Sequence, residues 1–80
     1  MGLEYRLNDN KNGLVVTGGK NLKGKLTIPH EDSFRGKIYP VMAIGTEAFL
    51  RCSGLTSIVI NNASLLEGTG VPEGVKIVKP

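Results

Sequence analysis

The sequence predicts a mainly β fold with one short helix, in a single small domain of 80 residues. Val and Ile occur seven and six times but Ala only three times, and β-branched residues favour strands over helices. Eleven glycines and four prolines supply frequent turns. The apolar residues alternate with polar ones over short stretches, which is typical of half-buried strands.

The N-terminal part of the chain predicts a β-hairpin over residues 3–17. Residues 3–7 alternate between apolar and polar side chains. Residues 8–13 are turn-forming and end in Asn-Gly, and residues 14–17 are apolar and β-branched. Two such segments on either side of a turn are expected to pair as antiparallel strands.

Four further short strands are expected after the hairpin. Pro29 ends the first of them, and Pro40 favours an edge position for the second, because proline has no N–H for the strand ladder. Between these two strands, residues 30–37 are polar and are expected to form a loop with Phe34 turned inward. The expected strands are residues 25–28, 37–41, 55–60 and 75–78, with a turn at 61–64 and a loop at 65–73.

One helix of at most two turns is expected at residues 46–51. Thr46 can accept a hydrogen bond from the first turn, and the acidic Glu47 suits the helix N-terminus. Gly54 follows shortly after the segment and is expected to end it.

Two of the expected strands repeat one pattern at an offset of 32 residues. Residues 26–29 read Leu-Thr-Ile-Pro, and residues 58–61 read Ile-Val-Ile-Asn. An aliphatic-x-aliphatic strand followed by a turn is typical of one rung of a solenoid. Each rung has an apolar face that it cannot bury alone, so rungs must stack.

The segment between these two strands carries a more specific pattern, Y-x-V-x-x-I-G-x-x-A-F-x-x-C-x-x-L-x-x-I-x-I. The matching residues are Tyr39, Val41, Ile44, Gly45, Ala48, Phe49, Cys52, Leu55, Ile58 and Ile60. This pattern resembles the BspA-like, or Treponema-type, leucine-rich repeat family. The upstream residues also resemble the lead-in to such arrays, and the resemblance covers about residues 3–61.

The resemblance implies an N-terminal hairpin (3–17) leading into a truncated leucine-rich-repeat-like β-solenoid. The repeat-like core would span residues 18–61, and residues 62–80 would be a divergent C-terminal rung or tail. The ten matched residues would form the structural core, with Cys52 as a buried thiol. Asn61 stands where the family has Pro, and no second A-F-x-x-C follows, so one full repeat has partial repeats beside it. Open sheet edges on such a short array favour self-association.

The residue types in this chain give little basis for catalysis, metal binding or a cofactor. Residues 30–33 (His-Glu-Asp-Ser) are adjacent in one expected loop and cannot adopt the geometry of a triad. The single Cys52 excludes an internal disulfide and a multi-cysteine metal site. The segments Gly-Gly-Lys (18–20) and Gly-Thr-Gly (68–70) lack the glycine spacing of phosphate-binding loops. We therefore expect no enzyme activity and no catalytic, metal or cofactor site.

The sequence also bears on where the protein is expected to act. No apolar run approaches the roughly 20 residues that span a bilayer, so no membrane insertion is expected. The first residues lack the basic and apolar stretches of a signal peptide. The resemblance nevertheless implies a cell-surface or secreted bacterial protein, and a cytoplasmic location is the alternative.

The favoured hypothesis is a protein-interaction or adhesion module. The resemblance implies that its partner is a host extracellular matrix protein or another bacterial surface protein, bound by outward side chains of the short strands. The candidate contact residues are Lys25, Thr27, Thr56, Ser57 and Val59.

The alternative hypothesis is a small basic β-domain that binds nucleic acid or an anionic polysaccharide. The formal net charge is +3, and basic residues cluster between positions 20 and 37. Aromatic rings could stack on bases beside them. This site would use Lys20, Lys23, Lys25, Arg35 and Lys37, with Phe34 and Tyr39. A third possibility is that the chain caps or spaces a longer repeat array.

Overall fold

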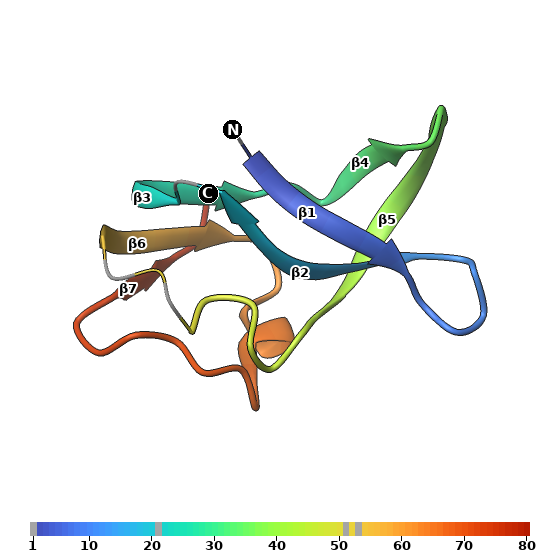
Figure 1. Cartoon of the computed structure of the whole chain (residues 1–80). Helices are drawn as coiled ribbons and strands as arrows, with labels where there is room; N and C mark the ends of the chain where they lie inside the picture. Colours follow the sequence, from blue (N-terminus) through green and yellow to red (C-terminus); the bar gives the residue numbers. More distant parts are fainter. Residues whose placement is uncertain (1, 21, 51, 53) are drawn as a thin grey trace.

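The computed structural model of this chain describes residues 2–20, 22–50, 52 and 54–80. Among these residues, seven strands form two sheets, which confirms the expected mainly β class (Figure 1). One sheet has the strand order β1-β2-β5-β4 and the other β3-β6-β7. The strands are β1 (Gly2–Leu7), β2 (Leu14–Lys20), β3 (Lys23–Ile28), β4 (Glu31–Phe34), β5 (Lys37–Ile44), β6 (Gly54–Ile60) and β7 (Lys76–Val78).

Strands β1 and β2 form the expected antiparallel hairpin, in which Leu7 pairs with Leu14. The side-chain oxygen of Asn8 closes the connecting loop by accepting hydrogen bonds from the N–H groups of Asn12 and Gly13, at 3.0 and 3.3 Å. Strand β2 continues beyond the expected end at residue 17. The hairpin thus begins one residue before the expected start at residue 3 and ends three residues after the expected end.

Three further pairings are parallel and join strands that are not consecutive in the chain or are joined by long connections. Strand β3 pairs with β6 in a register that joins Leu26 to Ile58 and Ile28 to Ile60. Strand β6 also pairs in parallel with β7, and in the other sheet β2 pairs in parallel with β5. The two segments that echo each other in the sequence are thus direct neighbours in one sheet.

The core lies between the two sheets and is entirely apolar. The side chains of Val16, Phe49 and Ile58 are 0% exposed, and no polar or charged side chain is buried among the described residues. Seven of the residues that match the repeat pattern are buried in this core: Val41, Ile44, Ala48, Phe49, Leu55, Ile58 and Ile60.

The remaining three matched residues are only half-buried. Cys52 packs against the core cluster, but its side chain is only half-buried, whereas a buried thiol was expected. Gly45 is half-buried at the end of β5, where its N–H donates to the carbonyl oxygen of Val16 at 2.8 Å. Tyr39 lies outside the core, on the projecting part of β5, where its ring meets Phe34.

The prediction of a helix at residues 46–51 is wrong for the part of the segment that the structure describes. Residues 46–50 form successive turns, and Arg51 lies outside the described residues. The N–H groups of Ala48 and Leu50 donate to carbonyl oxygens only three residues earlier, at 3.1 and 3.3 Å. So short a segment has too few hydrogen bonds to sustain an α-helix. Burial of Phe49 in the core fixes the turns instead.

Two other segments differ from the sequence-based expectation. The expected turn after β6 contains a short 3-10 helix, η1 (Ala63–Leu66), whose first turn is capped by the Asn62 side chain. The polar stretch expected to be a loop contains β4, which pairs antiparallel with β5. Strand β4 buries no complete face, so its sequence lacks the apolar alternation that marks a strand.

Proline and aromatic residues fit the β4–β5 hairpin in specific ways. Strand β2 pairs only with the later part of β5, so Pro40 lies where β4 is its one paired neighbour among the described strands. The expected edge position is therefore wrong for the strand as a whole, because β5 lies between β2 and β4, and only the part that contains Pro40 lacks a second paired neighbour among the described strands. Phe34 is half-buried and packs edge-on against Tyr39, with ring centroids 6.5 Å apart, rather than turning into the core.

Candidate functional site

The residues that the sequence nominated for partner contact lie together on the three-stranded sheet. The parallel register pairs Lys25 with Ser57 and Thr27 with Val59. Paired residues of adjacent strands point to the same face of a sheet. Because Ile58 points into the core, these four side chains point away from it.

Thr56 joins the same surface through an irregularity in strand pairing. Gly24 pairs with Leu55 and Lys25 with Ser57, so Thr56 is an extra residue in β6. Such a bulge turns a side chain out of the regular alternation. Thr56 is accordingly exposed, although Leu55 beside it is buried.

Strand β7 extends this surface by two residues that sequence reasoning missed. Lys76 pairs with Ser57, and Val78 pairs with Val59. The expected strand at 75–78 was the available signal, but its partner could not be inferred without the register. We call this surface the outer face, and it comprises Lys25, Thr27, Thr56, Ser57, Val59, Lys76 and Val78.

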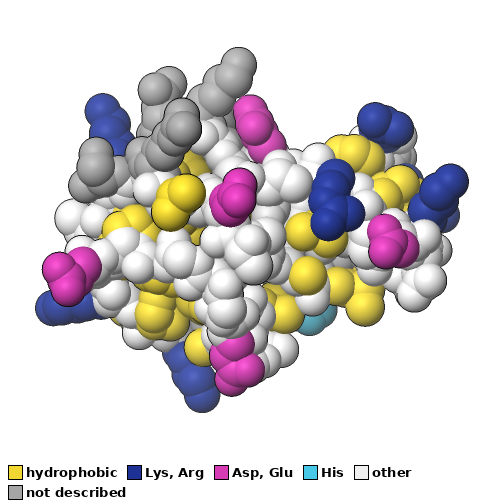
Figure 2. Space-filling view, turned by 60° about the horizontal axis from the view of Figure 1, so that its bottom comes forward, with side chains coloured by type: hydrophobic (Ala, Val, Ile, Leu, Met, Phe, Trp, Pro, Cys, Tyr) yellow, Lys and Arg dark blue, Asp and Glu magenta, His cyan; other side chains and the backbone are white. Residues whose placement is uncertain are grey.

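The β4–β5 hairpin gathers only part of the basic and aromatic set. The guanidinium carbon of Arg35 lies 5.0 Å from the ring centroid of Phe34, and the ammonium of Lys37 lies 5.4 Å from that of Tyr39. Figure 2 shows hydrophobic and basic side chains together at the end of the molecule that holds this hairpin. Two further basic residues, Lys23 and Lys25, lie on β3 in the other sheet, and the side chain of Lys20 is outside the described residues.

A hydrogen bond between Tyr5 of β1 and Asp32 of β4 joins the β4–β5 hairpin to the β1–β2 hairpin. The Tyr5 hydroxyl donates to the Asp32 carboxylate, Oη to Oδ2, at 2.8 Å. Burial, together with this hydrogen bond and the negative charge of Asp32, raises the pKa of Tyr5 above its usual range. Tyr5 therefore remains a neutral donor that holds β1 against β4.

The side chains of residues 30–33, the His-Glu-Asp-Ser segment, do not converge on one point in the described structure. The His30 side chain is 74% exposed, and its Nδ1 lies 4.0 Å from the Glu31 carboxylate. Asp32 accepts from Tyr5, and Ser33 is exposed. Within the described ranges, no group of three or more His, Cys, Asp or Glu side chains is placed to hold a metal ion. In the same part of the chain, no helix has the length and apolar character needed to cross a membrane.

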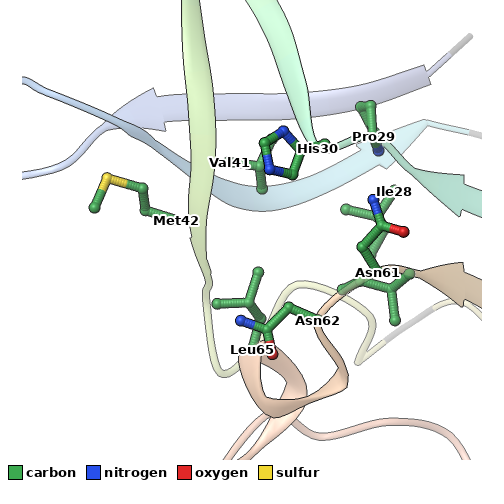
Figure 3. Close-up of a pocket in the computed structure, with 9 residues that line it drawn as sticks. Ile28, Pro29, His30, Val41, Met42, Asn61, Asn62 and Leu65 are labelled. Atoms are coloured by element: carbon green, nitrogen blue, oxygen red, sulfur yellow. The ribbon is translucent and has the colours of Figure 1, made fainter. Parts of the chain in front are cut away.

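A pocket that the sequence did not indicate lies where β3 and β6 end. Its volume is about 290 Å³, and its walls come from the ends of these strands, from β5 and from η1 (Figure 3). Residues from four separate elements meet there only after folding, so no local pattern could have revealed it. The lining residues are Ile28, Pro29, His30, Val41, Met42, Ile60, Asn61, Asn62 and Leu65.

No protein-family model, curated protein or solved structure matches this chain. A functional proposal therefore depends on the outer face, the β4–β5 hairpin and the pocket, and on the charges and hydrogen bonds around them.

Proposed function

We propose that this chain is a non-enzymatic protein-interaction module that binds a protein partner through the outer face. The observation that supports the proposal is the parallel register of β3 and β6, which aligns Leu26 with Ile58. Strands stacked in this way present their outward side chains as rows, and stacked repeats use such extended surfaces for binding.

The same pairing supports interpretation of the chain as a short solenoid of the leucine-rich-repeat type. One rung would consist of β2 and β3, the next of β5 and β6, and the last of η1 and β7. Three pairings agree with this order, because β2 lies beside β5, β3 beside β6, and β6 beside β7. On this proposal, the BspA-like resemblance extends to function, and the protein acts at a bacterial surface or after secretion.

The composition of the outer face suits a protein partner better than a small molecule or a polyanion. The aliphatic Val59 and Val78 lie in one row with the hydroxyl of Thr27, and a Lys occurs at each side of Ser57. The face has no acidic residue. We infer a partner surface of mixed polar and apolar character with some acidic groups, as in ordinary protein interfaces.

The test is a binding panel with the folded chain and two matched variants. The ligands are fibronectin, fibrinogen, heparin and a mixed single-stranded oligonucleotide, each at low and physiological salt. Thr27→Glu adds a charge on the outer face, and Ser33→Glu adds the same charge on exposed β4 as the control. We expect saturable, salt-resistant binding to a matrix protein that Thr27→Glu weakens about tenfold and Ser33→Glu leaves unchanged.

Three outcomes of this panel would contradict the proposal. If Thr27→Glu and Ser33→Glu change the affinity equally, the outer face does not take part in the interaction. Binding to heparin or the oligonucleotide alone, with steep loss on adding salt, would indicate the basic β-domain alternative.

The grouping of Phe34, Arg35, Lys37 and Tyr39 favours that alternative, but Glu31 and Asp32 on the neighbouring strand offset the two positive charges. If no ligand of the panel binds, the remaining interpretation is that the chain caps or spaces a longer repeat array.

A further inference from the structure

The pocket at the ends of β3 and β6 is lined mainly by apolar side chains. Ile28 and Ile60 are the last residues of these two parallel strands and are paired with each other. Val41 of β5 closes one side and Leu65 of η1 another, and Figure 3 shows their side chains around a common hollow. Ile28, Val41 and Ile60 also belong to the core cluster, so the pocket floor is the end of the core itself.

Two amide side chains stand at the rim, immediately after β6. The Asn62 oxygen accepts hydrogen bonds from the N–H and hydroxyl of Ser64, at 3.2 and 2.6 Å. Its NH₂ group donates to no described residue, so it can donate to a ligand. Asn61 forms no hydrogen bond with any described residue, so its amide can both donate and accept.

The described lining residues include no Asp, Glu, Lys or Arg, and His30 is the one titratable group among them. A charged ligand group would therefore enter without a compensating partner, which is unfavourable. Among the described lining residues there is no Phe, Tyr or Trp, and the one aromatic ring, the His30 imidazole, belongs to a side chain that is 74% exposed, so a sugar or nucleobase would find little stacking surface. The inserted part of a ligand is thus uncharged and aliphatic.

The size of the pocket limits the ligand further. A volume of about 290 Å³ is near the lower end of the range for ligand pockets, roughly 300 Å³. It suits one large side chain and a flanking peptide group rather than a nucleotide or another cofactor. The amide donors of Asn61 and Asn62 are complementary to peptide carbonyl groups, which are strong acceptors.

We propose that this pocket binds an aliphatic side chain, such as that of Leu, Ile or Met, from an extended peptide. The Asn61 and Asn62 amides bind the peptide carbonyl groups on either side of that residue. The pocket is lined by core-facing and terminal residues, whereas the outer face uses the opposite side chains of the same strands. The two proposals therefore depend on different residues, and either can fail without the other.

The test is an NMR titration of the folded ¹⁵N-labelled chain with N-acetyl-leucine N-methylamide. For a probe of this size we expect a dissociation constant of about 1 mM, with shifts at the amides of residues 28–30, 41–42 and 60–65. The alanine analogue should bind roughly tenfold more weakly because it leaves the aliphatic walls uncovered. The aspartate analogue should not saturate.

Two asparagine variants separate hydrogen bonding from general surface effects. Asn61→Ala removes an exposed rim amide and should weaken leucine-probe binding about threefold without changing the fold. Asn10→Ala changes an exposed asparagine in the β1–β2 loop and should bind as wild type. No saturable shifts, equal binding of the alanine probe, or shifts outside the pocket would overturn the proposal. The titration uses a small-molecule probe and no protein partner, so its result does not depend on whether the outer face binds a matrix protein.

Discussion

Leu26 and Ile58, which are 32 residues apart in the sequence, are direct partners in neighbouring parallel strands. Their side chains face the same apolar core, where Ile58 is 0% exposed. Between them the chain completes the β4–β5 hairpin and the turns around Phe49 before returning beside its starting strand. The repeated aliphatic residues are therefore explained by a shared side of the sheet, since Ile58 belongs to the core cluster and the half-buried Leu26 on the adjacent strand packs against it.

Truncation of Ile58 should destabilise the fold much more than truncation of its exposed neighbour. We expect Ile58→Ala to lower the free energy of unfolding by about 3 kcal/mol, because a full side chain is lost from a closed core. Thr56→Ala should change it by less than about 0.5 kcal/mol. Urea denaturation followed by circular dichroism measures both. If Ile58→Ala does not fold, Ile58→Val should still cost about 1 kcal/mol; equal effects at positions 56 and 58 would contradict the assigned register.

Removal of the Tyr5 hydroxyl should loosen the β4–β5 hairpin. Tyr5→Phe leaves the half-buried Asp32 carboxylate without its donor, and we expect a loss of about 1 kcal/mol in unfolding free energy. Tyr39→Phe is the matched control, since no hydrogen bond joins the Tyr39 hydroxyl to a described residue. Denaturant midpoints measured side by side check this expectation. An unfolding free energy of Tyr5→Phe equal to that of wild type, or a loss no larger than that of Tyr39→Phe, would contradict the assigned hydrogen bond.

The same tyrosine predicts how stability changes at alkaline pH. The pKa of Tyr5 is raised in the folded state, mainly by burial, from an unfolded value near 10.0. Above that pH the unfolded chain loses the Tyr5 proton while the folded chain keeps it, so unfolding becomes easier as pH rises. The stability that wild type has over Tyr5→Phe should therefore be complete below about pH 10 and should shrink above it. Urea unfolding of both proteins across this range tests the sign, which a constant or growing difference would contradict.

The turn of the β4–β5 hairpin should depend on glycine at one position. Gly36 has a φ of 83°, and a Cβ added there would meet nothing within 4 Å, so any cost of Gly36→Ala comes from the backbone alone. We expect a loss of about 1–2 kcal/mol, or at least about 4 °C in Tm. Gly70 has no positive φ, and its added Cβ would make an ordinary contact at 3.5 Å with the Thr46 carbonyl oxygen. Gly70→Ala should keep the wild-type Tm in thermal unfolding, and a similar loss in both variants would contradict the assigned turn.

The sequence predicted those parts of the fold whose side chains alternate against the core. The hairpin of β1 and β2 and the strands at Leu26 and Ile58 follow from apolar residues at every second position. The turns around Phe49 were mistaken for a helix, because a cap at Thr46 and an acidic residue after it are signals of local structure only. Core burial of a single aromatic ring decided that conformation. Strand β4 was missed because its pairing with β5 depends on the turn at Gly36 rather than on an apolar face.

The candidate sites were predictable to the extent that they lie on single strands. Alternation along β3 and β6 separated Lys25 and Thr27 from the core residues beside them. The contributions of Lys76 and Val78 were missed, because the register of β7 against β6 is set by tertiary packing. The pocket was missed entirely, since its walls come together from the ends of distant segments.

The most direct test of this account is the register of β3 against β6 in solution. Nuclear Overhauser effects between backbone protons report which residues of neighbouring strands lie opposite each other, and a chain of 80 residues is suitable for this measurement. The account predicts parallel-strand contacts from Leu26 to the Ile58 region and from Ile28 to the Ile60 region. An antiparallel pattern, or a register shifted so that Ile58 no longer lies opposite Leu26, would contradict the stacked-rung interpretation and the outer face built on it.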